Sequence, residues 1–194
     1  MGPGNGTAFD ERRGMAKEAE ESLRKILKEL NYYWHKYGDV RYCPYCHHTL
    51  PKTENAPDFI TAQVFTYIEA KNSDHTGTWR WVEIGEDGER KNQRAWLIAH
   101  QGWLYIVLGK GRAPKEKSAF LIPFEDWLAK IEPILIANGQ KSIRLETIGK
   151  RPGARELLAD YQLEWNKGSW HIPKEHVWFH DLDTKIRSYY DTRE

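Results

Sequence analysis

Two acidic residues and a lysine lie close together in the sequence, each in a short run rich in β-branched and aromatic residues. Asp58 stands in the run PDFI (57–60), and Glu69 and Lys71 stand in the run FTYIEAKNS (65–73). Such runs predict strands, and a hairpin of two neighbouring strands would bring the carboxylates together. Two carboxylates beside a lysine suit a hard divalent cation and a negatively charged substrate. The pattern therefore indicates metal-dependent cleavage of phosphodiester bonds.

Hydrophobic periodicity predicts the elements that would position these residues. Residues 15–30 carry apolar side chains at helical spacing, which predicts an amphipathic helix that ends near Asn31. Residues 32–42 favour a strand and residues 43–55 a loop. After the two acidic strands, the pattern predicts a strand-like stretch at 79–83, a helix at 92–101, a buried strand at 103–108, a strand at 119–122 and a helix at 123–136. This order of helix, three strands, helix and strand predicts a mixed α/β layer fold.

The length of 194 residues, with 40% hydrophobic residues and nine tryptophans, predicts one packed domain. We expect residues 1–13, which are polar and Gly-rich, to be disordered. Residues 14–194 would form the domain, with an aromatic-rich C-terminal extension at 137–194. No apolar run reaches the length of a membrane span, and the N-terminus has no signal-peptide core. The expected compartment is the cytoplasm, or the host-cell cytoplasm for a viral protein.

The acidic motif and the element order resemble the PD-(D/E)XK nuclease superfamily, whose core has this same order of elements. Pro57 and Asp58 match the first half of the signature, and the triplet EAK (69–71) matches the second half. The resemblance implies a restriction-endonuclease-like mixed sheet flanked by helices. It also implies that Asp58 and Glu69 bind Mg²⁺ or Mn²⁺ with help from the Ala70 carbonyl. Lys71 would orient the attacking water and offset charge on the phosphate.

A second match lies in the first predicted helix. Gly14 precedes Glu18 by four positions in the run RGMAKE (13–18), which resembles the start of the first helix in cellular Holliday-junction resolvases. The resemblance implies that Glu18 joins the site directly or through water. Gln93 falls where related nucleases carry a glutamine, and would steady Lys71 or a phosphate. The resemblance covers roughly residues 13–136, and the chain has no obvious junction-inserting stalk.

The segment CPYCHH (43–48) holds both cysteines of the chain. A glutaredoxin-type redox pair is disfavoured because no amphipathic helix follows the first cysteine. Covalent haem attachment is disfavoured by the lack of an export signal. The remaining alternatives are a structural Zn²⁺ site that uses Cys43 and Cys46, or two reduced thiols in a turn. The further zinc ligands would come from His47, His48, His35, His171, His176 and His180.

The formal net charge is only +1, so any nucleic-acid surface must be local. The first group of basic residues comprises Lys110, Arg112, Lys115 and Lys117, and we expect it to contact DNA. The second group comprises Lys141, Arg144, Lys150, Arg151 and Arg155. By themselves such groups are typical of a solvated surface, and DNA contact becomes the better interpretation if the carboxylate site is real.

Taken together, these patterns predict a homodimeric, Mg²⁺-dependent DNA endonuclease that acts on branched DNA such as Holliday junctions. A symmetric dimer would match two strands related by a two-fold axis. One alternative is a nuclease for linear duplex or single-stranded ends. Another is a non-catalytic nucleic-acid-binding module stabilised by zinc at Cys43 and Cys46. For the nuclease, Asp58→Asn, Glu69→Gln and Lys71→Ala should abolish cleavage while leaving folding nearly intact.

Overall fold

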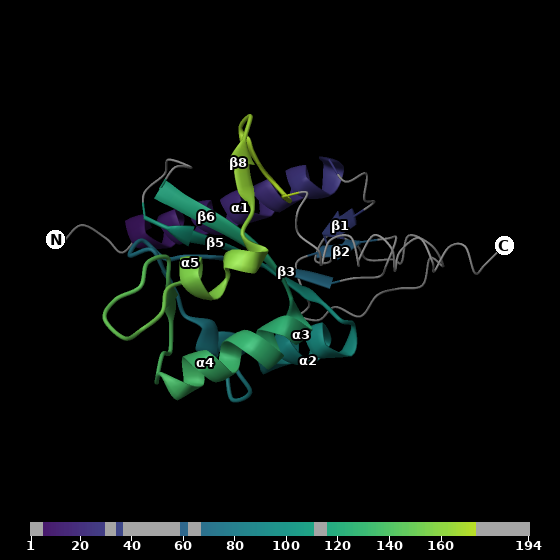
Figure 1. The fold of residues 1–194 in the computed structure, drawn as a ribbon. Coiled ribbons are helices and arrows are strands. Elements are labelled where there is room, and N and C mark those ends of the chain that lie inside the picture. The colour runs from purple at the N-terminus through teal and green to yellow at the C-terminus, as the bar shows by residue number, and fades with distance from the viewer. Residues whose placement is uncertain (1–5, 30–33, 37–58, 62–66, 111–115, 174–194) are drawn as a thin grey trace.

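The computed structural model describes residues 6–29, 34–36, 59–61, 67–110 and 116–173 (Figure 1). Within these ranges the chain has a mixed α/β structure, as predicted. The elements, in chain order, are α1 (Gly6–Glu29), β1 (Trp34–Lys36), β2 (Phe59–Thr61), β3 (Tyr67–Asn72), β4 (Thr78–Trp79), a 3₁₀ helix (Trp81–Ile84), α2 (Lys91–Ala99), β5 (Trp103–Gly109), β6 (Lys117–Pro123), α3 (Phe124–Asp126), a π-helical segment (Trp127–Ile131), α4 (Glu132–Ala137), β7 (Ile143–Arg144), α5 (Ala154–Leu157), a second 3₁₀ helix (Ala159–Tyr161), β8 (Glu164–Asn166) and β9 (Ser169–His171).

A five-stranded mixed sheet with the order β1-β2-β3-β5-β6 forms the centre of the fold. β2 pairs antiparallel with β3, and Phe59 lies opposite Ile68. β3 pairs parallel with β5, and Glu69 lies opposite Leu104. A parallel pair needs a crossover connection, and α2 lies within the segment that connects these two strands. The predicted strand at 103–108 is confirmed, because every residue of β5 is buried.

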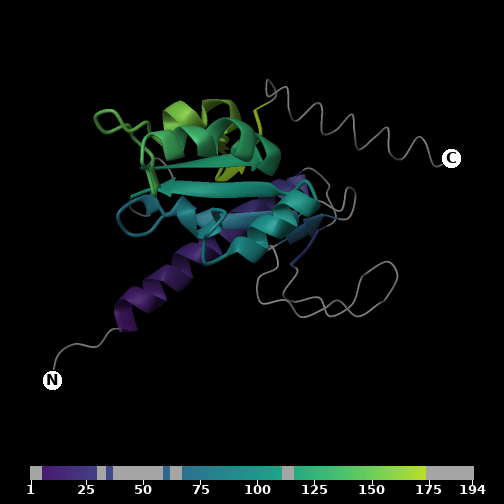
Figure 2. The same cartoon turned by 90° about the horizontal axis from the view of Figure 1, so that it is seen from below.

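Helices cover both faces of this sheet (Figures 1 and 2). Successive side chains of a strand point to opposite faces, and the two hydrophobic cores follow that alternation along β5. Leu104, Ile106 and Leu108 belong to the core that also contains buried residues of α2, α3 and α4. Tyr105 and Val107 belong to the core formed with α1 and the β8–β9 hairpin. We call these the α2 face and the α1 face of the sheet.

The predicted helix at 123–136 is also confirmed in outline. It runs from α3 through the π-helical segment to α4, and Phe124, Trp127 and Leu135 point into the core. Trp127 is fully buried, and its ring lies 5.4 Å from the ring of Trp79 and 6.3 Å from the ring of Trp81. Several tryptophans therefore serve to pack the core on the α2 face.

Two predictions about element boundaries were wrong. Helix α1 begins at Gly6, inside the segment 1–13 that we expected to be disordered. Glu11, Arg12 and Arg13 are good helix formers, and one interior glycine costs only about 1 kcal/mol, so Gly14 does not stop the helix. The stretch 79–83 is a strand only at Trp79, and a 3₁₀ helix begins at Trp81. Both tryptophans are buried, so the alternating pattern reflects burial without a continuous strand.

The start of the predicted C-terminal extension packs against the core. β7 pairs antiparallel with β4, and Leu163 and Trp170 are buried in the core on the α1 face.

No helix of the described ranges is long and apolar enough to cross a membrane.

Candidate functional site

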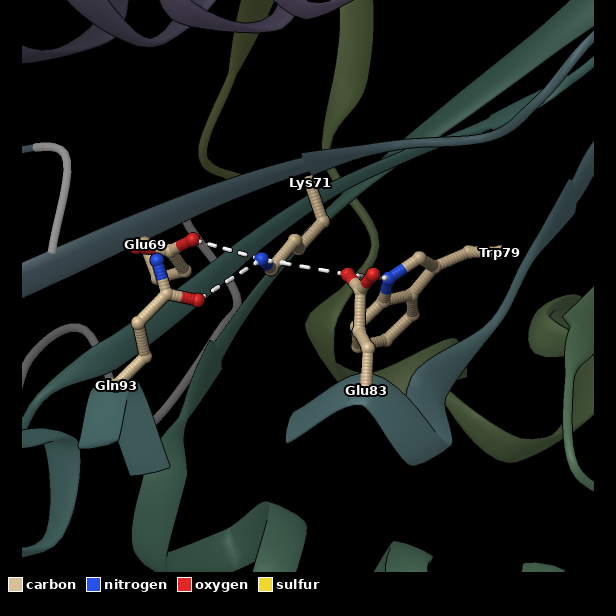
Figure 3. Close-up of polar contacts among 5 residues, drawn as sticks. All are labelled: Glu69, Lys71, Trp79, Glu83 and Gln93. Carbon is tan, nitrogen blue, oxygen red and sulfur yellow. Dashed lines mark hydrogen bonds and ion pairs between the residues drawn. The ribbon is translucent and has the colours of Figure 1, made fainter. Parts of the chain in front are cut away.

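Strand β3 presents Glu69 and Lys71 on the α2 face of the sheet. Their neighbours Ile68 and Ala70 pack into the core on the α1 face, so the alternation of the strand directs Glu69 and Lys71 to the opposite side. There, the 3₁₀ helix supplies Glu83 and α2 supplies Gln93 (Figure 3). Side chains from three elements therefore converge on one ammonium group.

Lys71 Nζ is the centre of this cluster. It lies 2.7 Å from Glu69 Oε1 and 3.3 Å from Glu83 Oε1. It also donates a hydrogen bond of 3.2 Å to Gln93 Oε1. The indole Nε1 of Trp79 donates to Glu83 Oε1 at 3.0 Å. Two carboxylates, one amide and one ammonium are thus held together in what we call the Lys71 cluster.

Most of the Lys71 cluster is buried, so its charged groups interact strongly with one another. Glu69 has an exposed side-chain fraction of 1% and Lys71 one of 5%, whereas Glu83 retains 25%. Buried charges must be paired and hydrogen-bonded to offset their desolvation. Two carboxylates against one ammonium leave the cluster with a formal charge of −1. A further positive charge, that of Arg90, also acts on Glu83.

The pKa of Glu83 is lowered from its usual value. Burial by itself would raise this pKa, but the Lys71 ammonium, the Trp79 indole N–H and the positive charge of Arg90 stabilise the carboxylate more strongly. A carboxyl with a lowered folded-state pKa stabilises the fold above its unfolded pKa, and that stabilisation is lost as the pH falls through the folded-state value. Glu83 therefore stays ionised at neutral pH.

We expect Glu83→Gln to lower the free energy of unfolding at neutral pH, and we expect this loss to shrink as the pH falls below 4.5, the ordinary value for a glutamate. Urea unfolding of both proteins over the range from about pH 7 to pH 3 measures the difference. Glu86→Gln, at an exposed neighbour, controls for the loss of one negative charge. A Glu83→Gln loss that stays constant across this range would contradict the assignment.

Of the residues predicted from the sequence, Glu69, Lys71 and Gln93 come together as expected, but Glu18 does not join them. Glu18 Oε1 lies 2.6 Å from Lys117 Nζ. Lys117 and Ala119 are two positions apart in β6 and therefore point to the same face. Ala119 packs on the α1 face, so this ion pair lies across the sheet from the Lys71 cluster. The prediction that Glu18 joins the site is not met in this arrangement.

Lys117, which we expected to contact DNA, lies on the α1 face with Glu18. Its side chain is buried, with 7% exposed, and its ammonium is occupied by Glu18. A lysine next to a basic loop is usually exposed, and only the register of β5 and β6 shows that this one points inward. Lys110, at the end of β5, is exposed as expected.

The remaining sequence-predicted site residues lie outside the described residues. These are Asp58, Cys43, Cys46, His47, His48, Arg112 and Lys115. The zinc prediction therefore stays a prediction. His171, one of the distant zinc candidates, has ring contacts of 2.9 Å with Ser169 Oγ and the Asn166 carbonyl. In the part of the chain that the structure describes, no group of three acidic, histidine or cysteine side chains is placed to hold a metal ion.

Glu83 is a member of the site that the sequence does not single out. In the sequence, Glu83 is marked only by its charge within the aromatic stretch 79–83. A strand in this stretch would not have directed the Glu83 side chain toward Lys71. The 3₁₀ helix creates that geometry, because its turn is closed by hydrogen bonds from Glu83 N to Arg80 O (3.3 Å) and from Gly85 N to Val82 O (3.1 Å).

A groove of about 590 Å³ is lined by Glu83 of the Lys71 cluster. The 3₁₀ helix and the loop after it form one side, and residues of α4 form the other. The wall carries five carboxylates and three cations, namely Glu83, Glu86, Asp87, Glu89 and Glu132 against Arg80, Arg94 and Lys141. This excess of negative charge suits entry of a metal cation and would repel a phosphate until a cation is bound.

Comparison with known proteins gives no family for this chain: no protein-family model and no curated protein matches its sequence.

Proposed function

We propose that this protein is a metal-dependent DNA endonuclease of the PD-(D/E)XK type with a restriction-endonuclease-like fold. The observation that carries the proposal is the convergence of Glu69, Lys71 and Gln93, three residues singled out from the sequence for this chemistry, at one point between β3 and α2. The order α1, β1, β2, β3, α2 and β5 is also the predicted order of the core elements.

The pairing of β2 with β3 supports a role for Asp58. Phe59 lies opposite Ile68 in the sheet. Asp58 is the residue before Phe59, and Glu69 is the residue after Ile68. Each acid is therefore the chain neighbour of one member of the opposed pair Phe59 and Ile68. We assign Asp58 as the second carboxylate of the site.

The donor set fits Mg²⁺ or Mn²⁺. Magnesium keeps most of its waters and needs only one or two carboxylates together with the substrate phosphate. Asp58 and Glu69 would hold the ion with the Ala70 carbonyl, and Glu83 adds a carboxylate at the groove. When bound, the metal lowers the pKa of a water molecule and polarises the scissile phosphate.

The residues of the chain then position the reaction. Lys71 orients a water molecule for attack on phosphorus and offsets the negative charge that builds on the phosphate oxygens. Gln93 holds the Lys71 ammonium in place. The water oxygen forms a bond to phosphorus while the bond from phosphorus to the 3′ oxygen breaks. The departing oxygen gains a proton, so the products are a 5′-phosphate and a 3′-hydroxyl.

The proposed substrate is branched DNA, cut by a symmetric dimer that presents one Lys71 cluster to each of two strands. This part of the proposal comes from the resemblance of the helix around Gly14 and Glu18 to the resolvases. Glu18 itself is engaged with Lys117, so in this arrangement its role is to fix α1 against β6.

We expect the protein to cut a four-way junction at least about tenfold faster than a linear duplex of matched sequence in Mg²⁺, because the two sites of a dimer engage related strands of a junction together. Single-turnover gel assays with both labelled substrates measure the ratio. Equal rates would contradict junction selectivity and favour the linear-substrate nuclease. Binding of DNA without cleavage in Mg²⁺ or Mn²⁺ would favour the non-catalytic binding module.

A further inference from the structure

A second cavity lies outside the Lys71 cluster, in the segment between α4 and α5. It has a volume of about 320 Å³ and is lined by residues from Gly139 to Pro152. Three of its lining residues are cations, namely Lys141, Arg144 and Arg151. We call it the basic pocket. It belongs to the C-terminal third of the chain, for which the resemblance provides no role.

The basic pocket has a built wall. Gln140 is buried, its side-chain Nε2 donates to the Pro152 carbonyl at 3.2 Å, and its backbone carbonyl accepts from Trp81 Nε1 at 2.8 Å. At Gly153 the two arms of the loop pass so closely that a Cβ would lie 2.4 Å from the carbonyl carbon of Glu146. These contacts join the ends of the loop to each other and to the tryptophan core, so the pocket is formed before any ligand arrives.

The three cations of the basic pocket are available for an anion. Lys141, Arg144 and Arg151 are exposed, and none has an ion pair with a carboxylate among the described residues. The one acidic lining residue, Glu146, is engaged by Arg155. The pocket therefore carries a net positive charge within one short loop, and arginine forks match the oxygens of a phosphate.

The basic pocket adjoins the candidate active site through Lys141 and β7. Lys141 lines both this pocket and the groove that Glu83 also lines. Arg144 lies opposite Thr78 in the β4–β7 pair. The residue after Thr78 is Trp79, whose indole donates a hydrogen bond to Glu83. We infer that the basic pocket binds a backbone phosphate of the nucleic-acid strand whose scissile bond lies at the Lys71 cluster. This inference rests on the proposed function and specifies where the substrate is held.

The test compares two double variants that remove the same charge. Arg144→Gln/Arg151→Gln removes two cations of the pocket, and Lys25→Gln/Lys167→Gln removes two exposed lysines that do not line it. Fluorescence anisotropy with a labelled four-way junction, in EDTA and over a series of KCl concentrations, measures binding without cleavage. We expect the pocket variant to bind about tenfold more weakly. The slope of log K against log salt should fall by about 0.9 for each lost phosphate contact.

The control pair should bind and respond to salt almost as the wild type does. Arg151→Lys, which keeps the charge, should retain most of the affinity. Equal affinities and equal salt slopes for the two double variants would overturn the inference, as would a wild type that binds no DNA in EDTA. The proposed function can fail separately. If the wild type cuts no DNA in Mg²⁺ and only the pocket variant binds DNA more weakly, the basic pocket is a DNA-binding site and the nuclease proposal is wrong.

Discussion

Replacing Lys71 by methionine will lower the free energy of unfolding by about 3–5 kcal/mol, because removal of one partner leaves a buried charge uncompensated. The carboxylate in question is that of Glu69, whose side chain is 1% exposed and lies 2.7 Å from Lys71 Nζ. Sequence alone predicted that removal of Lys71 would leave folding nearly intact. The burial of the pair reverses that expectation.

The double variant Glu69→Gln/Lys71→Met should recover most of the loss, since a neutral amide is far less costly to bury than an unpaired carboxylate. Lys91→Met, at an exposed lysine on α2, controls for the substitution itself. Urea unfolding of the wild type, Glu69→Gln, Lys71→Met and the double variant forms a double-mutant cycle, with Lys91→Met measured alongside it. If Lys71→Met proves as stable as Lys91→Met, the buried ion pair described here does not exist.

Replacing Glu69 by glutamine will reduce cleavage by about 10²–10³-fold or more, an effect of the size seen when a group that stabilises the transition state is removed. Glutamine keeps the size of the side chain and leaves Lys71 in contact with Glu83 and Gln93. Glu69→Gln should therefore lose much less stability than Lys71→Met. Glu69→Gln separates the chemistry of the site from its stability.

The matched control for Glu69→Gln is Asp126→Asn. Asp126 Oδ1 lies 2.7 Å from Lys130 Nζ, the same separation as in the Glu69–Lys71 pair, and Asp126 Oδ2 also accepts a hydrogen bond from Tyr161. This carboxylate lines neither the groove nor the basic pocket. Asp126→Asn should cleave at the wild-type rate, which the same single-turnover assay determines.

The elements that carry the site could be predicted because their signals are local. The β-branched and aromatic residues around Glu69 mark a strand, and the continuous apolar run at 103–108 marks the buried strand β5. Gln93 could be placed because it opens the helix that follows β3. In each case a few neighbouring residues contain the whole signal.

The rest depends on contacts between distant parts of the chain. Glu83 reaches Lys71 only because the chain leaves β4 in a 3₁₀ turn. Lys117 is buried because the register of β6 turns it toward α1. Gln140 is fixed by Trp81, far away in the sequence. No local pattern predicts such pairs, because each is decided by how whole elements pack against one another.

The most direct measurement is a time course of cleavage of one labelled four-way junction by the wild type, Glu69→Gln and Asp126→Asn, each in Mg²⁺ and in EDTA. We expect cutting by the wild type and Asp126→Asn in Mg²⁺, no cutting in EDTA, and a loss of cutting by Glu69→Gln while its fold and its DNA binding persist. Cutting by Glu69→Gln at the wild-type rate would show that the Lys71 cluster is not the catalytic centre.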